Sequence, residues 1–111
     1  PLGLPDAGSL SELARKVLAS MASGALAVLN AHFYSVAGKP FYQAIFDDPA
    51  AAYREASRVM PESMVRIMLK EVLRHASPGA SEDKIGEALK ALARGDASKF
   101  LELAGLGGRG A

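Results

Sequence analysis

The longest pattern of apolar residues runs from Leu10 to Gly38 and repeats every three or four positions, as one face of a helix does. Its members are Leu10, Leu13, Val17, Leu18, Met21, Val28, Leu29, His32, Phe33 and Val36. Ser9 and Glu12 have the spacing of a capping box, which predicts that this helix begins at Ser9. The two halves of the pattern point in different directions on a helical wheel, so we expect a bend near Ser23-Gly24, with a break into two helices as the alternative.

Proline, glycine and small polar residues divide the rest of the chain into shorter helical patterns. The predicted helices cover residues 40–46, 49–59, 61–76, 82–94 and 97–104. Threonine is absent and β-branched residues do not alternate, so nothing favours a sheet. We therefore predict an all-α protein, a compact bundle of five or six helices with a long N-terminal helix. A flexible segment at 1–8 would precede a single domain at 9–105, and a flexible glycine-rich tail would occupy 106–111.

Composition limits the classes of protein that fit this pattern. A chain of 111 residues is long enough for one domain, and its formal net charge of +1 gives no general attraction to nucleic acid. Without cysteine it has no disulfides, thiolate nucleophiles or cysteine-based zinc sites. No signal peptide and no uncharged apolar run of about 18 residues is evident, so we expect a cytoplasmic protein with no membrane partner. A single Asn and a single Gln among many Ala, Arg and Gly residues suggest a thermophile.

No motif carries a reaction mechanism. Gly105, Gly107 and Gly110 have the spacing of a dinucleotide fingerprint, but no strand precedes them and no helix follows. His32 and His75 lie on different predicted helices, and no nucleophile motif surrounds any serine. We therefore predict a protein that is not an enzyme and has no metal and no cofactor.

One polar helix face offers a candidate interaction site. Arg66, Lys70 and Arg74 lie at i, i+4 and i+8 on the clearest helix, where they form a basic stripe that could contact phosphates or an acidic partner. Glu62 and Glu71 lie close by in sequence and reduce its net charge, so an ordinary solvated face is favoured. Nucleic acid is the alternative, less favoured partner.

Aromatic residues are concentrated in one stretch, residues 32–49, which holds five of the seven in the chain. This stretch is either a site or a well-filled part of the core, and the core is favoured for Phe33, Phe41, Phe46 and Tyr53. Tyr34 and Tyr42 lie off the apolar faces and are candidates for the rim of a pocket or an interface. His32 lies near the middle of the apolar arc, so we expect it to be a buried core histidine bonded to a carbonyl or a tyrosine hydroxyl.

Three segments carry a resemblance to a known family. They read LARKVLASMASGALAVLNAHFY, AGKPFYQAIFDDPAAAYREASRVM and MVRIMLKEVLRHA. Over residues 10–104 the chain resembles a family of small archaeal helical domains of unknown function that are described as signalling output domains. The resemblance implies an archaeal, non-enzymatic regulatory or interaction role and carries no catalytic residues.

The apolar positions of the first helix together span more than half of the helical wheel, wider than the arc of about 100° that one core-facing side needs. Leu26 and Phe33 lie toward one edge of this arc, and we expect the surplus to need a second partner. The sequence therefore favours a helical interaction domain that acts through contacts with a protein partner or with its own copy, as a homodimer.

Overall fold

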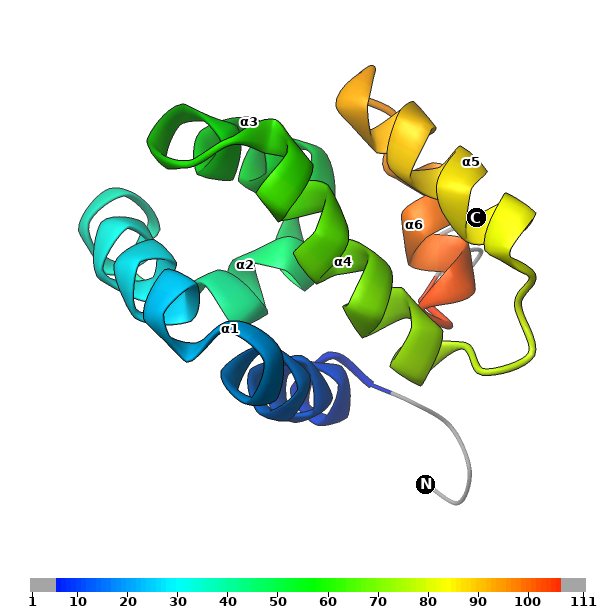
Figure 1. Ribbon diagram of the computed structural model, residues 1–111, viewed down its shortest axis with the longest axis horizontal. Helices are drawn as coiled ribbons and strands as arrows, with labels where there is room; N and C mark the ends of the chain where they lie inside the picture. Colours follow the sequence, from blue (N-terminus) through cyan, green and yellow to red (C-terminus); the bar gives the residue numbers. More distant parts are fainter. Residues whose placement is uncertain (1–5, 107–111) are drawn as a thin grey trace.

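Six helices make up residues 6–106, the part of the chain that the computed structural model describes (Figure 1). They are α1 (Ala7–Ala37), α2 (Phe41–Asp47), α3 (Pro49–Val59), α4 (Glu62–Ala76), α5 (Glu82–Ala93) and α6 (Ser98–Leu103). No strand occurs among these residues, so the predicted all-α class and the long first helix are confirmed. Most of the two segments expected to be flexible lies outside the described residues.

Local capping residues set most of the helix ends. The turn after α1 needs Gly38, whose φ of 73° is left-handed, and the Asp48 side chain caps α3 ahead of Pro49. The capping box expected at Ser9 is wrong, because α1 begins two residues earlier with Asp6 as its N-cap. The Ser9 backbone N–H donates to Asp6 Oδ1 at 2.7 Å, so Ser9 is already inside the first turn.

α1 bends at Ala22, whose φ of −157° and ψ of 60° are not helical. The bend lies one residue before Ser23-Gly24, the pair at which the sequence predicted it. Both halves of α1 contact α2 as a result. Ser11, before the bend, lines a small depression with Tyr42 of α2, and Phe33, after the bend, contacts Phe41.

Asn30 provides the polar contact that anchors α2. The N-cap of α2 is Pro40, which supplies no side-chain acceptor, and the backbone N–H of Phe41 donates instead to Asn30 Oδ1 at 3.0 Å. The rings of Phe33 and Phe41 pack beside this hydrogen bond with their centroids 5.2 Å apart. The short helix α2 is thus fixed to α1 by both a polar and an apolar contact.

The core lies between α1 and α4 and extends under α5 and α6. The helix α4 contributes its whole apolar stripe, Val65, Met68, Leu69, Val72 and Leu73. The four aromatic residues assigned to the core from the sequence, Phe33, Phe41, Phe46 and Tyr53, are buried as predicted. Phe46 also packs against Phe100 of α6, with ring centroids 6.1 Å apart. The aromatic stretch is therefore chiefly core.

We predict that Asn30→Ala lowers the free energy of unfolding by about 1–3 kcal/mol, because it leaves the Phe41 N–H without an acceptor in a half-buried setting. Urea denaturation followed by circular dichroism measures this change. Ser35→Ala is the matched control, since it removes an exposed polar side chain from the same helix and should change the free energy by less than about 0.5 kcal/mol. Equal effects of the two substitutions would contradict the role given to Asn30.

Candidate functional site

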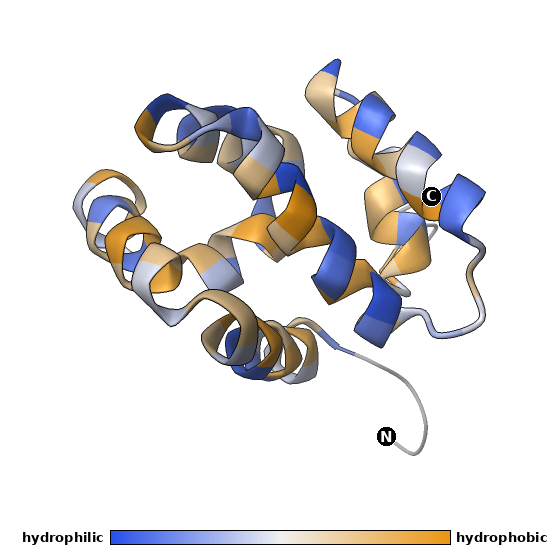
Figure 2. Cartoon of the chain, in the orientation of Figure 1, coloured by the Kyte–Doolittle hydropathy of each residue, from blue (hydrophilic) through white to orange (hydrophobic). Residues whose placement is uncertain are grey.

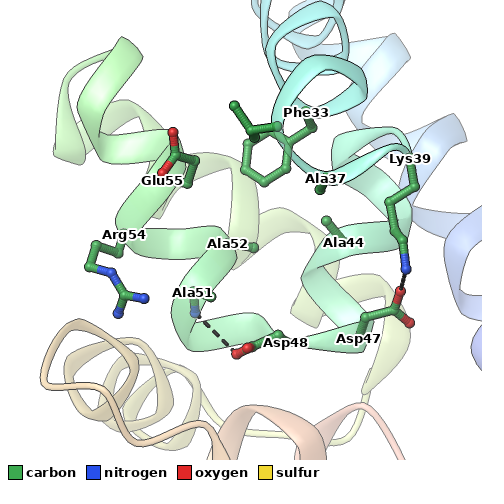
Figure 3. Close-up of a pocket in the computed structure, with 11 residues that line it drawn as sticks. Phe33, Ala37, Lys39, Ala44, Asp47, Asp48, Ala51, Ala52, Arg54 and Glu55 are labelled. Carbon is green, nitrogen blue, oxygen red and sulfur yellow. Dashed lines mark hydrogen bonds and ion pairs between the residues drawn. The ribbon is translucent and has the colours of Figure 1, made fainter.

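A groove of about 360 Å³ lies between the end of α1, α2 and α3, and we call it the α1–α3 groove (Figure 3). Its walls include Phe33, Val36, Ala37 and Ala44, which give it an apolar interior. Seven of the eleven residues that line it belong to the aromatic stretch at 32–49. That stretch therefore fills the core and also forms one wall of a surface groove.

Charged side chains surround the apolar interior of the α1–α3 groove. Lys39 and Asp47 form an ion pair on one side, and Arg54 and Glu55 of α3 lie on the other (Figure 3). Asp48 is used for capping, because its Oδ1 accepts the N–H of Ala51 at 3.2 Å. No Ser, Thr, Tyr or His is among the residues that line the groove. The groove offers a binding surface and no nucleophile paired with a base.

His32 is half-buried, and the prediction that it is a buried core histidine is wrong. Its side chain is 27% exposed, and Nε2 lies 2.6 Å from a carboxylate oxygen of Glu55 on α3. This hydrogen bond is the largest cause that holds the pKa of Glu55 below its ordinary value of 4.5, with smaller contributions from Arg58 and Arg54. The imidazole therefore has an anionic partner at the protein surface, which links α1 to α3.

The two tyrosines expected to rim a pocket or an interface lie apart from each other. Tyr34 is 57% exposed on α1, whereas Tyr42 is half-buried on α2 and lines a depression near the start of α1. Tyr42 thus fits the predicted rim of a small pocket. Tyr34 is available to an interface.

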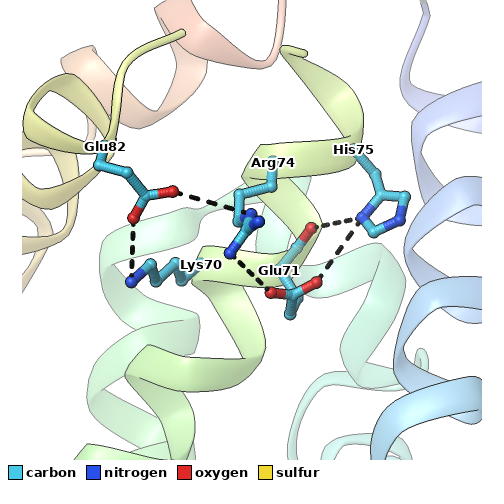
Figure 4. A network of polar contacts seen from close by, with 5 residues as sticks. All are labelled: Lys70, Glu71, Arg74, His75 and Glu82. Atoms are coloured by element: carbon cyan, nitrogen blue, oxygen red, sulfur yellow. Dashed lines mark hydrogen bonds and ion pairs between the residues drawn. The ribbon is translucent and has the colours of Figure 1, made fainter.

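The three residues of the basic stripe all take part in ion pairs. Lys70 Nζ lies 3.1 Å from Glu82 of α5, and Arg74 lies 3.5 Å from Glu71 and 3.8 Å from Glu82 (Figure 4). Arg66 lies 3.3 Å from Glu62. Because each cation has a carboxylate within 4 Å, the stripe presents little net positive charge. Nucleic-acid binding through this stripe stays a prediction without electrostatic support.

A second groove, of about 320 Å³, lies between α3 and the end of α5, and we call it the α3–α5 groove. Tyr53 and Glu62 lie on its wall, with the Tyr53 hydroxyl donating to Glu62 and accepting from Arg66 Nε at 2.9 Å. The pKa of Tyr53 is raised mainly because its hydroxyl is partly buried. The pKa of Glu62 is lowered mainly because its carboxylate accepts the hydrogen bond from Tyr53.

Ser57 also lines the α3–α5 groove, and no motif or periodic pattern in the sequence singles it out. Its hydroxyl oxygen is buried and has no hydrogen-bond partner among the described residues. An unsatisfied buried hydroxyl is unfavourable by about 1–3 kcal/mol, so native proteins contain few of them. Arg54 and Arg94 flank this part of the groove.

The solvent side of α1 after the bend is uncharged. We call this surface the outer face of α1; it consists of Gly24, Ala27, Val28, Ala31, Tyr34 and Ser35, all exposed. No Asp, Glu, Lys or Arg occurs between Val17 and Gly38. Leu26 and Phe33, the apolar residues that the sequence analysis expected to need a second partner, are buried in the core. Val28, a large apolar residue of the outer face of α1, is 55% exposed.

By length and composition alone, α1 is long and apolar enough to cross a membrane, contrary to the expectation from the sequence. Only 22% of its most apolar 18-residue window is buried. A core helix of a globular protein can pass the same test, and the inward residues Leu26, Leu29 and Phe33 pack into the core. Length and hydropathy therefore do not assign this helix to a membrane.

No group of three or more His, Asp or Glu side chains within residues 6–106 is arranged to hold a metal ion. Comparisons of the chain with protein-family models, with curated proteins and with solved structures find no match. The resemblance to archaeal helical output domains thus stays a prediction, and any function must be argued from the residues themselves.

The lowered pKa of Glu55 predicts a pH dependence of stability. A carboxyl whose pKa is lower in the folded state stabilises the protein above its unfolded value of about 4.5, and this contribution is lost as pH falls through the folded pKa. We expect Glu55→Gln to be less stable than the wild type at neutral pH, with a difference that shrinks on acidification. Urea denaturation at several pH values measures it.

Glu102→Gln is the control for this experiment. Glu102 is exposed and forms no ion pair within the described part of the chain, so its substitution should change the free energy of unfolding little. Wild type and Glu55→Gln losing stability in parallel on acidification would contradict the role of the His32–Glu55 pair.

Proposed function

We propose that this protein is a non-enzymatic helical interaction domain that associates with a second copy of itself through the outer face of α1. The observation that supports this proposal is that the outer face of α1 is both exposed to solvent and free of charged side chains. Val28 and Tyr34 are more than half exposed there, whereas α4 and α5 carry hydrophilic residues on every turn (Figure 2). Exposed apolar surface that lacks charge is typical of an interaction site.

A second copy suits this face better than a charged partner does. A surface without charge offers no electrostatic complementarity to an acidic or basic protein, but it meets an identical surface across a two-fold axis without repulsion. Gly24, Ala27 and Ala31 are small, which allows the backbones of two packed helices to approach closely.

The size of the face limits the strength of association. The straight part of α1 after the bend is about 24 Å long, and a helix with its side chains is about 10 Å in diameter. One half of the surface of such a helix, the most that the outer face can bury, is about 400 Å². A standard interface buries about 800 Å² on each partner, so we expect a weak dimer with a dissociation constant in the range of about 10–500 μM.

A lipid surface is a less suitable partner for the same face. Helices that lie in a membrane interface carry Lys and Arg on their polar side, where these residues contact anionic headgroups. The outer face of α1 has neither, and the opposite side of the helix packs into the core. A regulatory, output-type role and a place in the cytoplasm complete the proposal, and they rest on the resemblance and on composition.

We predict that the mass measured by light scattering after gel filtration rises with concentration from the monomer value of 11.6 kDa toward twice that value. Ala31→Glu places a charge at the centre of the outer face and should raise the dissociation constant at least tenfold, since two like charges would meet across the axis. Alanine and glutamate both favour helix, so the fold should be retained.

Ala19→Glu is the matched control, because it makes the same change at an exposed position of α1 before the bend, beside Lys16. It should dimerise as the wild type does. A strict monomer at high micromolar concentration would exclude the proposal, as would co-sedimentation with anionic lipid vesicles in place of dimerisation.

A further inference from the structure

Two arginines with no ion-pair partner within residues 6–106 line the α3–α5 groove. Arg54 projects from α3, and Arg94 follows the last turn of α5. Figure 3 shows the Arg54 guanidinium turned away from the Glu55 carboxylate beside it in sequence. The two cations come from different helices and lie at one groove, so their charges add there.

The acidic residues around these arginines are already engaged. Glu62 is the only acid that lines the groove, and it is bonded to Tyr53 and Arg66. Asp96, close enough to Arg94 to interact with it electrostatically, accepts hydrogen bonds from the backbone and hydroxyl of Ser98. Glu62 is balanced by Arg66, whereas Glu55 and Asp96 lie close enough to Arg54 and Arg94 to offset part of their positive charge without forming an ion pair with them.

The backbone at the end of α5 does not compete for these cations. The carbonyl oxygens of Ala91 and Leu92 already accept the backbone N–H groups of Arg94, Gly95 and Asp96. In contrast, the Ser57 hydroxyl, three residues after Arg54 on α3, has no hydrogen-bond partner within residues 6–106. Ser57 is also one of the residues that line the groove.

We propose that the α3–α5 groove binds a phosphate group of a small molecule, with Arg54 and Arg94 as charged donors and Ser57 as a neutral donor. Planar guanidinium groups bind phosphate through paired hydrogen bonds, and two of them at one groove match the charge of a dianion. The groove volume of about 320 Å³ is within the range of small-molecule sites. This site is separate from the outer face of α1 and does not depend on self-association.

The experiment is a titration of the ¹⁵N-labelled protein with inorganic phosphate, followed by amide chemical shifts at constant ionic strength with sodium chloride as the replaced salt. We expect saturable shifts confined to residues around Ser57 and Arg94. Arg54→Gln and Arg94→Gln should each weaken binding at least tenfold. Arg58→Gln is the matched control, because Arg58 is an exposed arginine of α3 that does not line the groove.

Three results would overturn the proposal. Shifts that grow linearly without saturation, or that spread equally over Lys16, Lys84 and Lys90, would indicate general screening. Equal weakening by Arg58→Gln and Arg54→Gln would place the phosphate elsewhere. Equal affinity for sodium acetate would show that the groove accepts any small anion and does not select phosphate. The spectra of the variants also report whether each remains folded.

Discussion

The hydrogen bond from the Phe41 N–H to Asn30 is the contact on which the arrangement of the first three helices depends. α2 has only seven residues and receives no cap from its own sequence, so it is too short to be stable without tertiary contacts. Asn30 and the ring of Phe33 fix its start against α1. Asp48 then ends α2 and caps α3, which determines where α3 lies relative to α1. The α1–α3 groove exists because these three helices are held at one junction.

Charge is distributed unequally over the molecule, and the packing of α1 explains why. α1 buries one face along both of its halves, and after the bend its other face carries no charge. Some ion pairs join neighbours within one helix, and others link two helices, as His32 and Glu55 link α1 to α3 and Lys70 and Glu82 link α4 to α5. The arginines that lack partners in the described region, Arg54, Arg58 and Arg94, lie on α3 and at the end of α5. The uncharged surface of the protein is therefore on α1 after the bend, and the arginines without an ion pair in the described region lie on other helices.

The sequence was sufficient for the helices and insufficient for the contacts between them. Gly38, the Asp48-Pro49 pair and Ser81 act within one turn of the backbone, so their effects follow from local geometry alone. His32 was misplaced because Val28 and Val36, which flank it on the helical wheel, are apolar but more than half exposed, whereas the core side of α1 after the bend consists of Leu26, Leu29 and Phe33. The same error put Leu26 among the surplus apolar residues. The partners Glu55 and Phe41 lie 23 and 11 residues from His32 and Asn30, beyond the reach of any periodic pattern.

α3 is held on two sides by polar contacts, and this determines what its arginines can do. The His32–Glu55 pair ties it to α1, and the contacts among Tyr53, Glu62 and Arg66 tie it to α4. Neither set includes Arg54, which lines both the α1–α3 groove and the α3–α5 groove. Arg54 is therefore the one arginine that lines both grooves, and a substitution at this position changes the charge at the rim of each of them.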